Sequence, residues 1–367
     1  MKGIKIMKPI FKKVMQIAIA VKDLDKALRI YADDYGIGPW SIYDFNPNTV
    51  KDMIRNDKRV DHKYRIATCS IGDMEMELIE PLDDKSIYAE FIKDHGEGIH
   101  HIAYEVEDYD KAMEFFRNKG LIVTQEGNWF GANKHIYTYL STEEDLKHSI
   151  EIYKTEPNYF KYKINKYGNR RMVYPVPDEV YPPEDKEEKI MKPIFKKVIQ
   201  IAIAVKDLDK ALRIYADDYG IGPWSVYNWM PNTVKDMIRN DKRLDHSYRL
   251  ATCSIGDMEI ELMGDLDDKN LYSEFIKKHG EGIQHIAYEV EDYDKAVEFF
   301  RNKGLIVTQQ GNWYGKHIYS NFNTEKDLKH SIEIFKTEPN FFKHKADEYG
   351  NRRMIYPVPD EVYPPEG

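Results

Sequence analysis

The chain has 367 residues, of which 32% are charged, and a formal net charge of −9. Lysine and arginine are dispersed among aspartate and glutamate, so no basic stripe indicates a nucleic-acid partner. The apolar runs are too short for a membrane span or a secretory signal, and one thiol per half (Cys69 and Cys253) makes no disulfide framework, so we expect a cytoplasmic protein with no membrane partner.

The chain consists of two nearly identical copies of one sequence. Residues 7–184 recur as residues 191–366, with 144 of 176 aligned positions identical. The numbering offset is 184 up to Ala132 and Asn133, which have no counterpart, and 182 after them. We therefore predict two domains, 7–184 and 191–366, each large enough for its own core and joined by the charged linker Glu184–Lys189.

Each copy contains a second, fainter repeat. In the first copy the segment Gln16–Leu28 resembles His101–Met113 over thirteen residues. Both begin with the apolar or alternating run that is typical of a strand, and both continue with apolar residues at helical spacing. The predicted helix N-caps are Asp23 and Asp108, and the predicted helix ends are Gly36 and Gly120.

Further strand patterns follow each predicted helix. They cover residues 64–70 and 75–79, and then 121–124, 135–140 and 149–153. Each unit therefore reads βαβββ, and we predict an α+β chain with modules at 14–80, 99–153, 198–264 and 283–335. The extensions 157–183 and 339–366 follow, the first predicted as a helix over Tyr159–Tyr167 and then an extended proline-rich arm.

Paired βαβββ modules with these strand starts resemble the vicinal oxygen chelate (VOC) superfamily. This superfamily includes glyoxalase I, methylmalonyl-CoA epimerase, extradiol dioxygenases and fosfomycin-resistance proteins. The resemblance covers about 140 residues of each copy and implies two glyoxalase-like domains. It also implies that each module supplies one metal ligand from its first strand and one from its last. Whether the modules pair within a copy or swap between copies stays open.

The family pattern, carried over one residue at a time, assigns a metal site to each copy. One carboxylate or one glutamine on a strand is weak evidence, because such residues are usually solvated. The same four residue types persist in both copies, and an oxygen-rich set with one imidazole suits Zn, Ni, Co, Fe or Mn. The order resembles one glyoxalase I pattern. It departs from the epimerase pattern, which is usually His/Gln/His/Glu, and departs further from the two-His, one-carboxylate iron site of extradiol dioxygenases. The expected ligands are Gln16, Glu77, His101 and Glu151, and Gln200, Glu261, His285 and Glu333.

The resemblance implies a metal-dependent isomerase acting on a small molecule. Family members of this kind move a proton next to a carbonyl through a metal-stabilised enolate, as an epimerase, a racemase or a glyoxalase does. Glu151 and Glu333 are the expected bases, and Glu77 and Glu261 would act on the opposite face. Two alternatives stay open: a metal-dependent lyase or hydrolase of the same superfamily, and a non-catalytic small-molecule binding protein.

Several other residues carry weaker expectations. His100, replaced by Gln284 in the second copy, is expected to face away from the metal site because neighbouring strand residues alternate. A surface turn is favoured over an acid–base pair for Asp61 and His62, and a solvated turn over a grip on a coenzyme A phosphate for Asn169–Arg171. His135 and His317 are candidates to hydrogen-bond a substrate, and Cys69 and Cys253 are expected to pack in the core.

The differences between the copies cluster around the expected metal strands. They concentrate in residues 42–46, 76–81 and 126–141, whereas the outer helix region 22–38 is unchanged. We therefore hypothesise a shared metal site with two different pockets, packed as an intrachain pseudo-dimer. Aromatic residues near these segments favour an aromatic substrate, with core packing as the alternative; they are Trp40, Tyr43, Phe45, Trp129 and Phe130.

Overall fold

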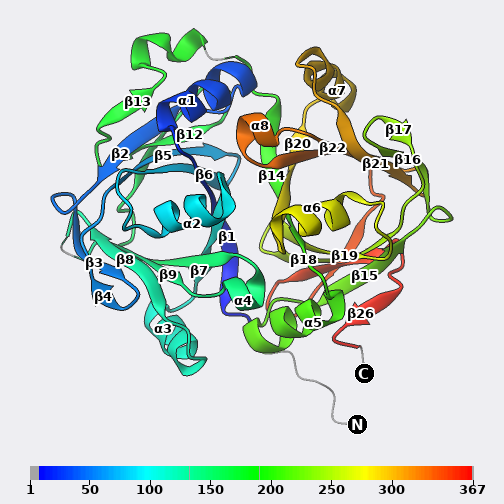
Figure 1. The fold of residues 1–367 in the computed structure, drawn as a ribbon, viewed down its shortest axis with the longest axis horizontal. Helices are drawn as coiled ribbons and strands as arrows, with labels where there is room; N and C mark the ends of the chain where they lie inside the picture. Colours follow the sequence, from blue (N-terminus) through cyan, green and yellow to red (C-terminus); the bar gives the residue numbers. More distant parts are fainter. Residues whose placement is uncertain (1–7, 132, 190, 366–367) are drawn as a thin grey trace.

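A computed structural model describes residues 8–131, 133–189 and 191–365. Met7, Ala132 and Glu366, which mark the ends of the copies and the insertion, lie outside the described residues. Two lobes lie side by side, the first coloured blue to green and the second green to red (Figure 1). No helix in the described ranges is long and apolar enough to span a membrane.

The first copy forms one sheet with short helices around it. Its sheet order is β11-β12-β5-β6-β1-β7-β10-β9-β8-β3-β4, with β13 joined through β2 to β5. Its elements are β1 (Phe11–Ala20), α1 (Leu24–Arg29), η1 (Ile30–Asp34), β2 (Trp40–Phe45), β3 (Val50–Arg55), β4 (Lys58–Arg59), β5 (Tyr64–Ile71), β6 (Met74–Pro81), α2 (Ile87–His95), β7 (Gly98–Val106), α3 (Tyr109–Asn118), β8 (Val123–Trp129), β9 (His135–Leu140), α4 (Glu143–Leu146), β10 (Ser149–Thr155), β11 (Lys161–Ile164), β12 (Arg170–Tyr174) and β13 (Glu179–Tyr181).

The second copy repeats this arrangement after the short helix η2 (Glu184–Lys189), with its own sheet in the equivalent order. Its elements are β14 (Phe195–Ala204), α5 (Leu208–Arg213), η3 (Ile214–Asp218), β15 (Trp224–Trp229), β16 (Val234–Arg239), β17 (Lys242–Arg243), β18 (Tyr248–Ile255), β19 (Met258–Asp265), α6 (Leu271–His279), β20 (Gly282–Val290), α7 (Tyr293–Asn302), β21 (Val307–Trp313), β22 (His317–Phe322), α8 (Glu325–Leu328), β23 (Ser331–Thr337), β24 (Lys343–Ala346), β25 (Arg352–Tyr356) and β26 (Glu361–Tyr363).

The two modules of a copy pair with each other and do not swap between copies. Their first strands, β1 and β7, are antiparallel neighbours at the centre of the sheet. The last strand of each module lies parallel to its own first strand, so β6 flanks β1 and β10 flanks β7. The predicted α+β fold of paired modules is confirmed, and both predicted N-caps form, with Asp23 and Asp108 each accepting a backbone N–H three residues later.

The predicted helix over Tyr159–Tyr167 is wrong. The extension instead forms β11, β12 and β13, of which β12 pairs with β5 and β13 pairs with β2. These pairings supply partners for strands at the rim of the first module, where unpaired backbone groups would otherwise be left. The local sequence shows no periodicity that reveals this partner, because it lies about a hundred residues away.

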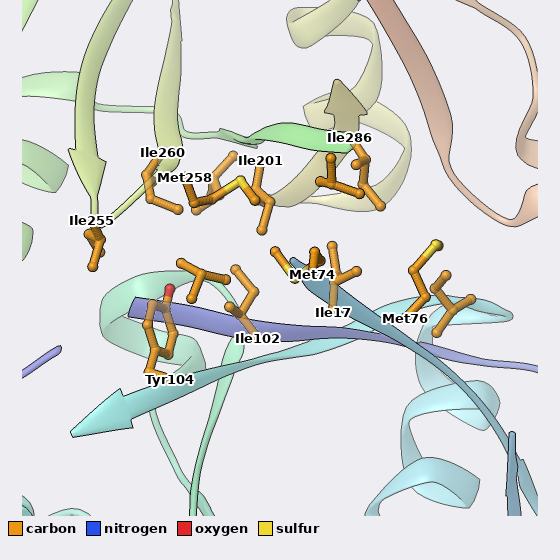
Figure 2. Packing of buried hydrophobic residues seen from close by; sticks show 14 of the residues in the cluster. Ile17, Met74, Met76, Ile102, Tyr104, Ile201, Ile255, Met258, Ile260 and Ile286 are labelled. Atoms are coloured by element: carbon orange, nitrogen blue, oxygen red, sulfur yellow. The ribbon is translucent and has the colours of Figure 1, made fainter. Parts of the chain in front are cut away.

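The two sheets pack back to back. Residues of the central strands alternate, so Gln16 faces the interior of its own copy and Ile17 faces the other copy. Figure 2 shows Ile17 and Ile102 of the first copy opposite Ile201 and Ile286 of the second. These side chains belong to one continuous buried cluster that spans both copies. The interface is therefore a hydrophobic core, and the two polar faces point away from each other.

Polar contacts across the interface follow the same pseudo-symmetry. The Tyr31 hydroxyl donates to the Leu328 carbonyl at 2.6 Å, and the Tyr215 hydroxyl donates to the Leu146 carbonyl at 2.6 Å. The ion pairs Lys147–Glu281 and Lys329–Glu97 repeat this equivalence at 3.2 and 3.1 Å. The copies thus form an intrachain pseudo-dimer held by matched contacts.

Candidate functional site

Four adjacent strands bring the predicted ligands of each copy together. In the order β6-β1-β7-β10, each strand places one of them, Glu77, Gln16, His101 and Glu151, on the face away from the other copy. All four side chains are buried, and His101 is fully so. The second copy gathers Gln200, Glu261, His285 and Glu333 on the equivalent strands.

The imidazole of each copy lies between two carboxylates. His101 Nε2 is 3.1 Å from Glu151 Oε2 and 3.8 Å from Glu77 Oε2. His285 Nε2 is 3.1 Å from Glu333 Oε2 and 3.9 Å from Glu261 Oε2. Within the described residues, only Glu261, His285 and Glu333 bring three ligand atoms within 4.8 Å of one another.

A β-bulge places His100 directly against the histidine of the ligand set. The register of β7 against β1 shifts between Ala18 and Ile19, so two residues of β7 oppose one of β1. His100 is therefore turned toward its neighbour, and the Nδ1 atoms of His100 and His101 lie 3.0 Å apart. His100 lines a cavity bounded by both copies and not the pocket above the ligands, as expected for the opposite face, while its ring contacts that of His101.

Gln284 replaces His100 in the second copy and contacts the ligand in the same way. His285 Nδ1 lies 2.7 Å from Gln284 Oε1, which can only accept, so His285 donates its proton there. The lone pair is then at Nε2, the atom that faces the two carboxylates. Such a partner behind the imidazole is typical of metal-ligating histidines.

Carboxyl groups crowd each site, and a third one was not predicted. Burial raises the pKa of Glu75 to about 7 and that of Glu151 to about 8. Burial, followed by the Glu151 and Glu75 charges, raises the pKa of Glu77 well above its usual range. Glu75 also accepts from Gln16 Nε2 at 3.0 Å. The alternation of Glu75 and Glu77 along one strand is the signal that would have revealed it.

These residues fit a divalent cation. His101 Nε2 and His285 Nε2 are buried, and neither has a hydrogen-bond partner among the described residues. Carboxylates concentrated around an unpaired imidazole nitrogen are costly to bury unless a positive charge joins them. The two carboxylates and the histidine of each set would hold the cation, with the glutamine oxygen as a fourth donor.

An aromatic pocket opens above each set. The cavity is about 290 Å³ in the first copy and about 380 Å³ in the second. His135 and His317 line these pockets, as predicted for their positions. The aromatic lining of the first pocket comprises Phe45, Tyr64, Tyr88, Trp129, Tyr137, Tyr139, Tyr153, Phe160 and Tyr162.

The five aromatic residues singled out in the sequence have different fates. Phe45 and Trp129 line the pocket. Trp40 is buried in the core against Tyr31, and Tyr43 packs edge-on against Trp129. Phe130 is 48% exposed at the surface. Core packing therefore explains Trp40 and Tyr43, the pocket explains Phe45 and Trp129, and neither explains Phe130.

Several lining residues differ between the copies. The larger second pocket exchanges aliphatic and aromatic residues and loses phenol hydroxyls, although its carboxylates are unchanged. The pairs that line both pockets and differ are Met15/Ile199, Phe45/Trp229, Ile66/Leu250, Tyr153/Phe335 and Tyr162/His344.

Two of the weaker expectations need correction. His62 is fully buried and stacks on Tyr64 with ring centroids 5.7 Å apart, so it does not belong to a surface turn, although Asp61 is exposed. The segment Asn169–Arg171 is not a solvated turn, because Arg171 is buried and pairs with Glu184 while Arg170 lines the first pocket. Cys69 and Cys253 are both buried in the core, as predicted.

Comparison with known proteins identifies relatives of both copies. Residues 15–139 and 199–322 each match the family model described as the glyoxalase/bleomycin resistance protein/dioxygenase superfamily. An ethylmalonyl-CoA/methylmalonyl-CoA epimerase from Cereibacter sphaeroides is 29% identical over 116 residues, which cover 31% of this chain and 76% of that protein.

Solved structures extend the likeness to nearly the whole chain. A mutant of 4-hydroxymandelate synthase from Streptomyces coelicolor matches 90% of this chain and 94% of its own, with a TM-score of 0.55 and 12% identity. A xylose isomerase-like TIM barrel/4-hydroxyphenylpyruvate dioxygenase fusion protein matches 91% of this chain and 50% of its own, with a TM-score of 0.50 and 10% identity. Likeness at these identities shows the arrangement of the fold.

Proposed function

Because the chain belongs to the glyoxalase/bleomycin resistance protein/dioxygenase (VOC) superfamily, as a tandem duplication, we propose that it is a divalent-metal-dependent isomerase. It would move a proton on a carbon next to a carbonyl, in the manner of an epimerase, a racemase or a glyoxalase. An epimerase is among its curated relatives. The reaction would take place in both copies, on ligand sets of identical composition.

One observation carries this proposal: an unpaired imidazole nitrogen between two buried carboxylates at the floor of an aromatic pocket. His101 Nε2 and His285 Nε2 each have this surrounding. A divalent cation bound there supplies a Lewis acid that stabilises negative charge developing on a substrate oxygen. The dioxygenase alternative is disfavoured, because each set has one histidine where a facial triad has two.

The carboxylates supply a base on each side of the histidine. Glu151 reaches it from β10 and Glu77 from β6, which lie on opposite sides of β7 and β1 in the sheet. An epimerase needs one group to remove a proton from one face of a carbon and another to return it to the other face. In the metal-free chain burial raises the pKa of Glu151 to about 8, and a bound cation would lower it, so that the carboxylate is ionised and able to accept a proton.

The walls of the pocket favour a substrate with a flat, apolar part. In the first copy, Phe45 and Trp129 pack with ring centroids 4.9 Å apart, and Phe160 lies 5.8 Å from Trp129. Paired phenols, such as Tyr64 donating to Tyr137 at 2.7 Å, complete a largely apolar lining. Arg170 adds a positive charge to the lining of the first pocket, which suits a substrate that carries an acidic group.

The proposal is tested by metal analysis combined with solvent deuterium exchange. The purified full chain is assayed for bound metal and then incubated in deuterated water with aryl and alkyl α-carbonyl acids and thioesters. We expect metal in the protein and metal-dependent exchange at the carbon next to the carbonyl. Metal without exchange would shift the assignment to a lyase or hydrolase, and a metal-free protein that still binds these compounds would indicate a binding protein.

A further inference from the structure

One pocket difference touches the ligand set itself. Tyr153 of β10 is Phe335 in β23. The Tyr153 hydroxyl donates to Glu151 Oε2 at 2.8 Å and also lies within hydrogen-bond reach of Gln16 Oε1. Phe335 has no hydroxyl, and Gln200 Oε1 is buried with no hydrogen-bond partner in the described part of the second copy.

The oxygen that Tyr153 engages is the one that faces the histidine. Glu151 Oε2 accepts from Tyr153 and also lies 3.1 Å from His101 Nε2. In the second copy, Asn321 Nδ2 donates to Glu333 Oε1 at 2.8 Å, which is the other carboxylate oxygen. Glu333 Oε2 is left facing His285. Asn321 occupies the position of Tyr139, which also hydrogen-bonds Glu151, so the second copy keeps a partner at this position and loses the one that Tyr153 supplies.

We infer that the two ligand sets bind a divalent cation with unequal affinity, and that the second copy is the tighter site. The inference rests on the proposed metal function. In the first copy the single Tyr153 hydroxyl proton is shared between two proposed ligand atoms, Glu151 Oε2 and Gln16 Oε1, and competes with the cation for one of them at a time. The equivalent atoms of the second copy have no such competitor. Hydrogen bonds to charged groups contribute enough to change binding at least tenfold. The compact cluster of Glu261, His285 and Glu333 agrees with this order.

Tyr153 thus acts on the cation through Glu151 and Gln16, as a positioning residue. The difference in metal affinity comes from residues around the ligands, because the four proposed ligands of one copy are matched in type by the four of the other. A tandem protein with two unequal sites retains one loaded pocket at cation concentrations that empty the other. Metal supply would then select which pocket is active.

The test is a stepwise titration of the full chain, freed of metal by a chelator, with Co²⁺ followed by absorbance and calorimetry. We expect two binding events whose Kd values differ at least tenfold. Glu333→Gln should remove the tighter event, and Glu151→Gln should remove the weaker one. The readout is binding, so it does not depend on knowing the substrate.

Exchanging the residues between the copies makes the test specific. Tyr153→Phe should tighten the weaker event about tenfold, and Phe335→Tyr should weaken the tighter event by a similar factor. Each variant carries the residue that the other copy already accepts at that position, so both are expected to fold. Tyr159→Phe is the matched control. It makes the same change at another position where the second copy has phenylalanine, Phe341, and Tyr159 does not line the pocket.

The outcomes separate this inference from the proposed function. Two equal events, a reversed assignment of the events, or no response to Tyr153→Phe would overturn the inference and leave the proposed function standing. Two unequal events without any deuterium exchange would support the inference and overturn the proposed isomerase. Failure to bind Co²⁺ at all would overturn both.

Discussion

The proposed ligands and the neighbouring glutamate, which form the floor of each pocket, are the same in both copies. The apolar side chains around them, which form the wall, are not. All four proposed ligands and the third carboxylate, Glu75 or Glu259, recur unchanged, while Phe45 faces the cavity where the other copy has Trp229. A floor of buried charges tolerates little change, because each group depends on the others for its partners. A wall of apolar side chains can change size and shape while the sheet stays intact. The difference supports the proposal that the two copies share one chemistry and select different substrates.

The back faces of the sheets offer a third region for comparison. They also differ, as at Met76 against Ile260 and Leu140 against Phe322, but only between apolar residues of the core. Such exchanges are tolerated where volume and polarity are kept. The core thus accepts substitution without chemical consequence, whereas the loss of a hydroxyl at position 335 alters hydrogen bonds to the ligands.

The largest expected effect comes from removing one base at a time. Glu151→Gln and Glu333→Gln each remove a proposed base and a proposed metal ligand together, so each should lower proton exchange in its own pocket by at least the roughly 10² to 10⁴-fold that a general base usually contributes. The rate of deuterium exchange is measured for each variant across aryl and alkyl substrates. Different substrate profiles would sharpen the comparison of the walls, whereas equal losses on every substrate would break it.

Removing the metal should make the stability of the protein depend on pH, because several carboxyl groups then lie close together without a cation. In the folded chain the pKa values of Glu75 and Glu259 are raised to about 7, and that of Glu151 to about 8, whereas in the unfolded chain they return to about 4.3. Between these values the folded state keeps protons that the unfolded state has lost. The free energy of unfolding of the metal-free protein should therefore fall as pH rises from about 5 to about 8, by on the order of a few kcal/mol.

Thermal melting after chelation, at pH 5.5 and at pH 8, measures this dependence, and added Co²⁺ should suppress it. Glu75→Gln and Glu259→Gln should reduce it by similar amounts, because the two floors are alike. A melting temperature that does not change between these pH values would contradict the crowding of protonated carboxyls.

Exchanging one apolar residue that lines the pocket should change substrate selectivity without changing metal binding. Phe45→Trp and Trp229→Phe should change the relative kcat/KM for aryl and alkyl substrates by about 10 to 200-fold, the range for one altered apolar contact. Co²⁺ binding should be unchanged in both variants. If the profiles do not move toward each other, the wall is not what distinguishes the pockets.

The smallest expected effect tests the symmetry of the interface. Tyr31→Phe and Tyr215→Phe each remove one hydrogen bond between the copies and should lower the free energy of unfolding by about 1 kcal/mol, by equal amounts. Denaturant titration of the whole chain measures both. Unequal losses would show that the scaffold itself, and not only the pocket wall, differs between the copies.

Much of the architecture could be predicted from local pattern. The inner repeat between Gln16–Leu28 and His101–Met113 predicted matched strands and helices, and the caps at Asp23 and Asp108 form as expected. Alternation along a strand also places ligand and core residues on opposite faces, as at Gln16 and Ile17. Periodicity and capping are local properties, so they can be recognised in the sequence without knowledge of the fold.

Features that depend on distant partners could not be predicted. The strand β12 exists because β5 lies beside it, and His100 turns toward His101 because a bulge shifts the register against β1. None of these relations is encoded by spacing along the chain.

By itself, the sequence determined the two nested duplications, the module pattern and the residue types that recur in both copies, because repeats and periodicity are carried by the order of residues. Only the tertiary structure decided that modules pair within a copy and that the sheets pack back to back, as Figure 2 shows. It also decided that Tyr153 donates to Glu151 Oε2, whereas the equivalent oxygen of Glu333 has no such donor among the described residues. Those outcomes depend on which surfaces and atoms meet across long stretches of chain, and that is set by packing and register and not by sequence spacing.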